Sequence, residues 1–61
     1  MYVLRFSRAD QKYVEVCIDD FSLACSFYNS VCLDFGFVRS GLYFYDNIRH
    51  DLILVDESER V

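Results

Sequence analysis

The sequence predicts an α+β fold: a single ββαββ domain, with a four-stranded antiparallel sheet and one central helix packed on one face. Residues 12–18 alternate between apolar and polar side chains, which is typical of a strand that is buried on one side. Residues 21–35 instead repeat apolar side chains every three or four positions, which indicates a helix with one apolar side. Because 61 residues suffice for one domain, we expect residues 1–61 to fold as a unit.

Four segments are predicted to be strands, because they combine β-branched and aromatic residues and are separated by polar turns. The strands are residues 2–7, 12–18, 42–45 and 51–56, with turns at 8–11 and 46–50, a connection or frayed strand start at 37–41 and a polar tail at 57–61. The last strand contains four consecutive apolar residues, Leu52–Val55. Such a run is typical of a strand buried on both faces, so we expect this strand in the middle of the sheet.

The predicted helix is bounded by recognisable signals at both ends. Asp19 or Asp20 can accept hydrogen bonds from the first amide groups, and their negative charge favours the positive end of the helix. Gly36 stands where a helix commonly ends in a left-handed residue. The apolar stripe consists of Phe21, Ala24, Cys25, Tyr28, Val31, Cys32 and Phe35, and Leu23 and Phe27 widen it. We therefore expect a helix of about four turns.

One helix can cover only one face of the sheet, so the other face is expected to meet solvent or a partner. The covered face is predicted to carry Leu4, Phe6, Val14, Val16, Ile18, Leu42 and Phe44. The other face then carries Val3, Arg5, Tyr13, Glu15, Cys17, Tyr43 and Tyr45. A mixture of tyrosine and charge of this kind is common at binding surfaces.

The composition predicts an acidic surface that is rich in tyrosine. Ten acidic residues oppose six basic ones, giving a net charge of −4, which disfavours binding to nucleic-acid phosphates. Six phenylalanines and five tyrosines are more large rings than one helix over a small sheet can bury completely. Some rings are therefore expected at the surface, where a partner chain could cover them.

No constellation for catalysis, a metal or a cofactor stands out in the sequence. His50 is the only histidine, no Cys-x-x-Cys pair is present, and three cysteines cannot all form disulfides within one chain. The acidic pairs 19–20 and 56–57 are explained as a helix cap and a strand exit. We expect a non-enzymatic protein without a metal or cofactor. The start of the sequence lacks a signal peptide and no apolar run is long enough to span a membrane, so we expect a cytoplasmic protein.

In its carboxylates and tyrosines the chain resembles the small acidic inhibitors that bacteriophages make against host machinery, including anti-CRISPR proteins. The resemblance implies an inhibitor that binds a basic protein partner and occludes its nucleic-acid-binding groove, in the cytoplasm of the host cell if a phage encodes it. Its partner-binding residues would be Tyr43 and Tyr45 as anchors, with Asp46, Asp51, Asp56 and Glu57 meeting arginine or lysine.

Two alternatives of other classes are open. The first is a small structural or regulatory subunit that forms a homodimer through the tyrosine-bearing sheet face. The second is a single-stranded nucleic-acid binder in which Tyr13, Tyr43 and Tyr45 stack bases while Arg5, Lys12 and Arg39 hold phosphates. Whether the carboxylates gather on one side does not follow from the sequence.

Overall fold

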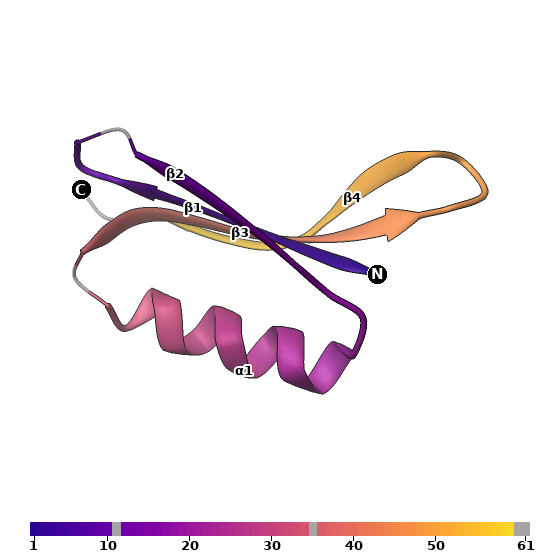
Figure 1. Cartoon of the computed structure of the whole chain (residues 1–61), viewed down its shortest axis with the longest axis horizontal. Coiled ribbons are helices and arrows are strands. Elements are labelled where there is room, and N and C mark those ends of the chain that lie inside the picture. Colours follow the sequence, from indigo (N-terminus) through magenta and orange to yellow (C-terminus); the bar gives the residue numbers. More distant parts are fainter. Residues whose placement is uncertain (11, 35, 60–61) are drawn as a thin grey trace.

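The computed structural model describes residues 1–10, 12–34 and 36–59 and confirms the α+β fold (Figure 1). The elements are β1 (Tyr2–Arg8), β2 (Tyr13–Ile18), α1 (Phe21–Cys32), β3 (Phe37–Asp46) and β4 (Asp51–Glu59). The strands form one antiparallel sheet in the order β2-β1-β3-β4. Helix α1 lies along one face of this sheet, so the molecule has two layers.

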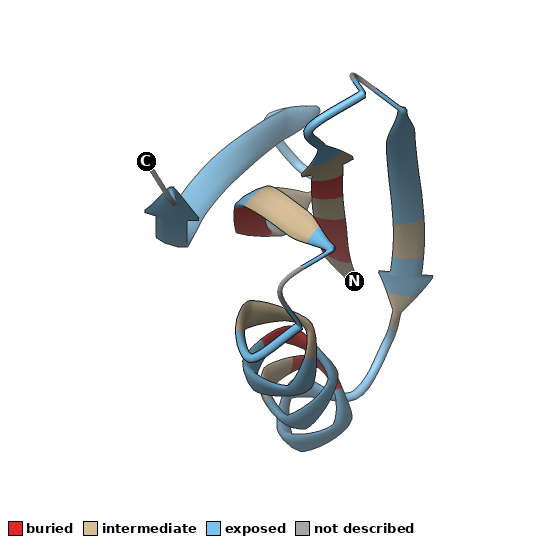
Figure 2. Ribbon diagram, turned by 90° about the vertical axis from the view of Figure 1, so that its left-hand side faces the viewer, coloured by how far each residue is buried: buried red, intermediate tan, exposed pale blue. Residues whose placement is uncertain are grey.

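The position of β4 differs from the sequence-based prediction. Because β3 pairs with β1, the two central strands are β1 and β3, and β4 is left at an edge with a single neighbour. Every residue of β4 is exposed, and the β3–β4 hairpin extends past the end of α1 (Figures 1 and 2). The prediction of a central strand buried on both faces is therefore wrong.

The C-terminal hairpin is also longer than the sequence predicted. Residues 37–41 are the first half of β3, because they pair with β1 on one side and with the end of β4 on the other. Residues 57–59 continue β4 and are not a tail, since they lie opposite Arg39–Gly41. A bulge at Leu42/Tyr43 leaves Val55 without a direct partner between the two halves of β4.

The core lies between α1 and the two central strands. Leu4 and Phe6 of β1 and Leu42 of β3 pack against Ala24 and Tyr28 of the helix, and all five are at most 3% exposed. Leu4 lies directly opposite both Val16 and Leu42, as the period-two alternation requires for residues that share a face. The two sheet faces thus have the composition that the sequence predicted.

The helix begins as predicted but ends earlier. Asp20 is the N-cap, and its carboxylate accepts a hydrogen bond from the Leu23 amide at 2.9 Å. At the other end α1 stops at Cys32, followed by the C-cap Leu33; predicted position Phe35 lies outside the described residues. Gly36 has no positive φ, so the left-handed stop was wrongly predicted. The Asp34 carboxylate accepts a hydrogen bond from the Gly36 amide at 2.8 Å.

Asp20→Ala is expected to lower the free energy of unfolding by about 1 kcal/mol, because it leaves the Leu23 amide without its side-chain acceptor. Urea denaturation followed by circular dichroism measures this loss. Asp19→Ala removes an equal charge from the neighbouring exposed position, where no side-chain hydrogen bond is formed with the described residues, and serves as the control. Equal losses in the two variants would contradict a specific capping role for Asp20.

Stability is expected to fall at alkaline pH through Tyr28, which lies in the core. Burial raises the pKa of Tyr28 above its ordinary value of 10.0, and the neighbouring Cys32 thiol adds to the rise. Since the unfolded chain loses this proton first, the contribution of Tyr28 is intact below pH 10 and is lost as the pH rises through the folded-state pKa. The slope approaches about 1.4 kcal/mol per pH unit. Urea denaturation between pH 8 and 11 should show a smaller decline for Tyr28→Phe than for Tyr45→Phe.

Candidate functional site

The face of the sheet opposite α1, called the open face below, carries two rows of polar residues that cross all four strands. The register places Glu15, Arg5, Gly41 and Glu57 side by side in one row. It places Tyr13, Ser7, Arg39 and Glu59 in the next row. Residues from four separate segments therefore meet on one surface because the strands pair in this order.

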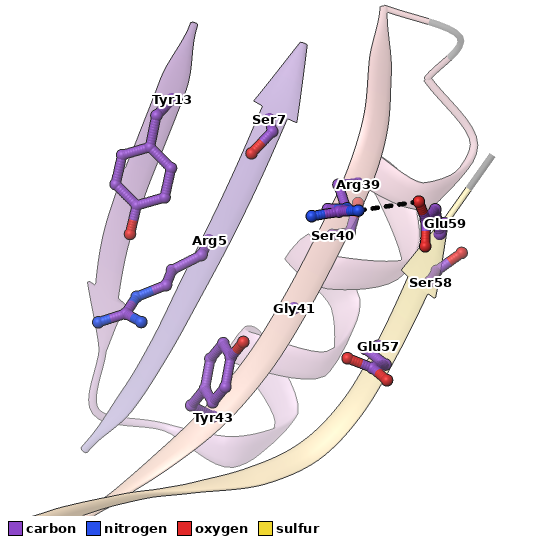
Figure 3. Close-up of a pocket in the computed structure, with 10 residues that line it drawn as sticks. All are labelled: Arg5, Ser7, Tyr13, Arg39, Ser40, Gly41, Tyr43, Glu57, Ser58 and Glu59. Carbon is purple, nitrogen blue, oxygen red and sulfur yellow. Dashed lines mark hydrogen bonds and ion pairs between the residues drawn. The ribbon is translucent and has the colours of Figure 1, made fainter. Parts of the chain in front are cut away.

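A hollow of about 580 Å³ lies on the open face between these rows (Figure 3). Gly41 forms its floor, because a residue without a side chain leaves space between Arg5 on β1 and Glu57 on β4. The Tyr43 ring lies across this glycine, so that an added Cβ would be only 2.8 Å from Tyr43 Cε2. The open face therefore has a shallow depression edged by one aromatic ring.

The two arginines of the open face are each held by a carboxylate. Arg5 Nε lies 2.8 Å from Glu15 Oε2, and the Tyr13 hydroxyl donates to the same oxygen at 2.8 Å. These hydrogen bonds, first that of Tyr13 and then that of Arg5, lower the pKa of Glu15. The Arg5 guanidinium also lies 5.2 Å from the centre of the Tyr43 ring.

Arg39 forms the second ion pair, with Glu59 at 3.0 Å. Both pairs are exposed, and exposed ion pairs contribute little to stability because water screens them. Their main effect is on charge distribution, because each arginine is neutralised locally by its own carboxylate.

Glu57 differs from the other carboxylates of the open face. It forms no hydrogen bond or ion pair with any residue that the structure describes, whereas Glu15 and Glu59 each hold an arginine. The reason is the row in which it lies, since its neighbour on β3 is Gly41, which has no side chain to offer. Figure 3 shows the Glu57 carboxylate at the edge of the hollow, opposite Tyr43. It is therefore available to a cation from outside.

The structure divides the six residues that the sequence singled out for partner binding. Tyr43, Tyr45 and Glu57 lie on the open face. Asp56 lies opposite Leu42 and so on the helix side of the sheet. The remaining two, Asp46 and Asp51, face each other at the end of the β3–β4 hairpin, where the Asp46 carboxylate accepts the Ile48 amide at 2.9 Å and the Arg49 amide at 3.3 Å. The carboxylates of this hairpin are thus spread over two faces and a turn.

Sequence reasoning missed Gly41 and Glu59, and it named Arg39 only as a phosphate contact in the nucleic-acid alternative. The sequence predicts Arg39 in a connection or frayed strand start and Glu59 in a tail, so it pairs neither with a neighbouring strand. The strand register brings them together. No period-two alternation marks these positions, since residues 56–59 are all polar.

The side chains of the open face offer ion pairing, hydrogen bonding and aromatic contact. Among residues 1–10, 12–34 and 36–59 there is no group of three or more histidine, cysteine or acidic residues that could hold a metal ion. Cys17 lies on the edge strand β2, whereas His50 lies in the turn between β3 and β4 and approaches the Tyr45 hydroxyl at 3.3 Å. Within the described ranges, no helix has the length and apolar character needed to cross a membrane.

Comparisons with protein-family models, curated proteins and solved structures find no match for this chain. Its function is therefore inferred from the open face and from the exposed hairpin.

Gly41→Ala is expected to alter the open face while the domain stays folded. The added Cβ would meet Tyr43 Cε2 at 2.8 Å and the Tyr43 hydroxyl oxygen at 3.0 Å, and both atoms lie at the free end of a side chain that can rotate. Gly41 has no positive φ, so alanine introduces no backbone strain. We expect stability within about 1 kcal/mol of the wild type and altered NMR shifts of the Arg5 side chain, which contacts the ring. Unchanged Arg5 shifts or an unfolded variant would contradict this expectation.

Proposed function

We propose that this chain is a non-enzymatic protein-binding domain whose open face binds a basic surface of a partner protein. The observation that carries the proposal is Glu57, the open-face carboxylate without an ion-pair partner among the described residues, at the edge of the hollow over Gly41. By resemblance to the acidic phage inhibitors, the partner surface would be a nucleic-acid-binding groove, and binding would block it.

The geometry supports a single basic side chain as the element that enters the hollow. An arginine or lysine of the partner would place its charge against Glu57 and its aliphatic stem beside the Tyr43 ring. Arg5 and Arg39 would not repel it strongly, because Glu15 and Glu59 already neutralise them. Tyrosine next to a partly enclosed charged group is a common composition for the residues that dominate binding energy.

An apolar border adjoins this polar hollow along the same face. Tyr45 lies opposite Leu52, and Tyr43 lies opposite Leu54. Leu52 and Leu54 are 37% and 49% exposed, so a partner that covers them removes apolar surface from water. The border would contribute affinity, whereas the ion pair in the hollow would contribute orientation and specificity.

Capture from a bacterial lysate followed by competition tests the proposal. The immobilised domain should retain a nucleic-acid-binding protein at about 50 mM salt and release most of it at about 500 mM, because long-range attraction between the two charged surfaces is screened. The nucleic acid bound by that protein should compete with the domain for it. A captured protein that binds the domain and its nucleic acid simultaneously would overturn the occlusion proposal.

The two alternatives from the sequence predict different outcomes in the same experiment. A homodimer through the open face would depend little on salt, because apolar contacts would dominate it. A base-stacking domain would bind labelled single-stranded DNA directly at low salt. The base-stacking alternative has less support, since the open-face arginines that would hold phosphates already form ion pairs with carboxylates.

A further inference from the structure

Strand β4 presents an apolar edge to solvent on both of its faces. Leu52, Ile53, Leu54 and Val55 are between 37% and 49% exposed, and β4 pairs with β3 alone. Edge strands of soluble proteins are commonly protected by charged residues, proline, bulges or a covering element. β4 has acidic residues at its ends and a bulge at Val55, but its run Leu52–Val55 contains no charge or proline, and the β3–β4 hairpin extends past α1 (Figure 1). Its four-residue apolar run has the composition of a strand buried on both sides.

We infer that β4 of a second copy of this chain pairs with β4, antiparallel and centred on Ile53, so that two four-stranded sheets join into one of eight strands. A two-fold axis perpendicular to the sheet relates the copies. Ile53 then lies opposite Ile53 of the second copy, and Leu52 lies opposite its Leu54. Both helices lie on the same face of the joined sheet.

The residues already paired within one chain support this register on the helix side. Within the chain, Ile53 lies opposite Phe44, Phe44 opposite Tyr2, and Tyr2 opposite Ile18. Tyr2 and Phe44 are in ring contact, with centroids 5.4 Å apart, and Phe44 and Ile53 are 36% and 46% exposed. Joining the copies at Ile53 makes this row of apolar residues continuous across all eight strands.

The open side gives a matching row. Tyr45 lies opposite Leu52 in one copy, and in the proposed register Leu52 meets Leu54 of the second copy, which lies opposite Tyr43 of the second copy. Over residues 52–54, apolar side chains therefore meet apolar side chains on both faces of the joint. The hollow over Gly41 lies farther along the strands than this row.

Charge selects this register over its neighbour. A joint centred on Leu54 would place Asp51 opposite the second copy's Glu57, and like charges directly opposite are unfavourable. The joint centred on Ile53 instead places Asp51 opposite the second copy's Val55. It also brings the turn that carries Arg49 and His50 beside Asp56 and Glu57 of the second copy. Neither Arg49 nor Asp56 forms an ion pair with the described residues of its own chain. The apolar middle of β4 and the opposite charges near its two ends make this strand complementary to itself. We therefore infer that the chain that pairs with β4 is a second copy.

Sedimentation equilibrium of the whole chain between about 1 and 200 µM tests the association. The wild type should show a monomer–dimer equilibrium, and Ile53→Lys should shift its dissociation constant upward by at least about tenfold, because two lysines would oppose each other at the centre. Leu23→Lys is the control, since Leu23 is 63% exposed on α1 and remote from the joint. The inference would be overturned by a wild type that stays monomeric throughout this range, or by a dimer that withstands Ile53→Lys. If the wild type stays monomeric, a strand of another protein becomes the candidate partner of β4.

Disulfide trapping tests the register. Ile53→Cys should give a covalent dimer under mild oxidation, and mass spectrometry should identify a disulfide-linked peptide that joins position 53 of one copy to position 53 of the other. Ser58→Cys, on the same strand, should not, because the two copies of residue 58 would lie about 34 Å apart along the strands. Trapping of Ser58→Cys as readily as Ile53→Cys would overturn the register. The dimer is measured on the chain alone and partner capture on the chain with a second protein, so failure of the proposed function and failure of the dimer can be told apart.

Discussion

Replacement of Phe6 by alanine is expected to lower the free energy of unfolding by about 3–5 kcal/mol, the largest single-residue effect on stability that we predict. Phe6 is 1% exposed, and its ring contacts those of Phe27 and Phe37 at centroid distances of 5.9 and 5.6 Å. Alanine would leave a void between the sheet and the helix. For a chain of 61 residues the total stability is roughly 3–9 kcal/mol, so a substantial fraction of the variant should be unfolded at room temperature.

Urea denaturation followed by far-UV circular dichroism measures this loss. Phe21→Ala is the matched control, because it removes the same atoms from a ring that is 52% exposed at the start of α1. We expect Phe21→Ala to cost well under half as much, since the ring has less apolar surface to return to water. Similar losses in the two variants would show that the core is not centred on Phe6. At high protein concentration, dimerisation through β4 would raise the measured free energy of unfolding of both variants. The two variants should therefore be compared at low micromolar concentration.

Sequence patterning predicted the element order because each element has its own hydrophobic period and its own boundary signals. The period-two alternation of residues 14–18 and the stripe that begins at Phe21 are local properties, and local contacts decide them. The capping aspartate was predicted for the same reason, although sequence alone left Asp19 and Asp20 as equal choices. The hydrogen bond to the Leu23 amide distinguishes them.

The place of each strand in the sheet depends on non-local contacts, and the sequence-based prediction of a central β4 was wrong. The run Leu52–Val55 has the pattern of a central strand, yet β3 pairs with β1 and leaves β4 at the edge. In the proposed dimer this conflict disappears, because β4 would be a central strand of an eight-stranded sheet. The apolar run would then match the burial of β4 in the dimer, because β4 lies at the edge of the sheet in a single chain.

The candidate site depended even more on register. A carboxylate such as Glu57 cannot be distinguished from Asp56 by composition, since the two are adjacent and both are exposed. One faces Gly41 on the open side and the other faces Leu42 on the helix side. A bulge between Leu42 and Tyr43 sets which of them reaches the hollow, and bulges are not visible in a sequence of this kind.

Charge reversal at Glu57 is expected to weaken binding to the captured partner by at least about 30-fold. Removing one member of an ion pair that is shielded from water costs roughly 2–5 kcal/mol, and lysine would in addition repel the partner's basic side chain. The effect should be local, because the Glu57 carboxylate lies at the edge of the hollow and lacks an ion-pair partner among the described residues. Isothermal titration calorimetry of Glu57→Lys against the captured protein measures it.

Asp19→Lys separates a local role from a general effect of charge. Each of the two variants changes the net charge from −4 to −2, but Asp19 precedes the cap of α1 and is not a residue of the open face. If attraction between the whole acidic domain and a basic partner were sufficient, the two variants would bind equally weakly. We expect Asp19→Lys to bind within a few-fold of the wild type. Equal weakening would move the proposed site away from the hollow, because it would mean that net charge, and not the position of Glu57, determines the affinity.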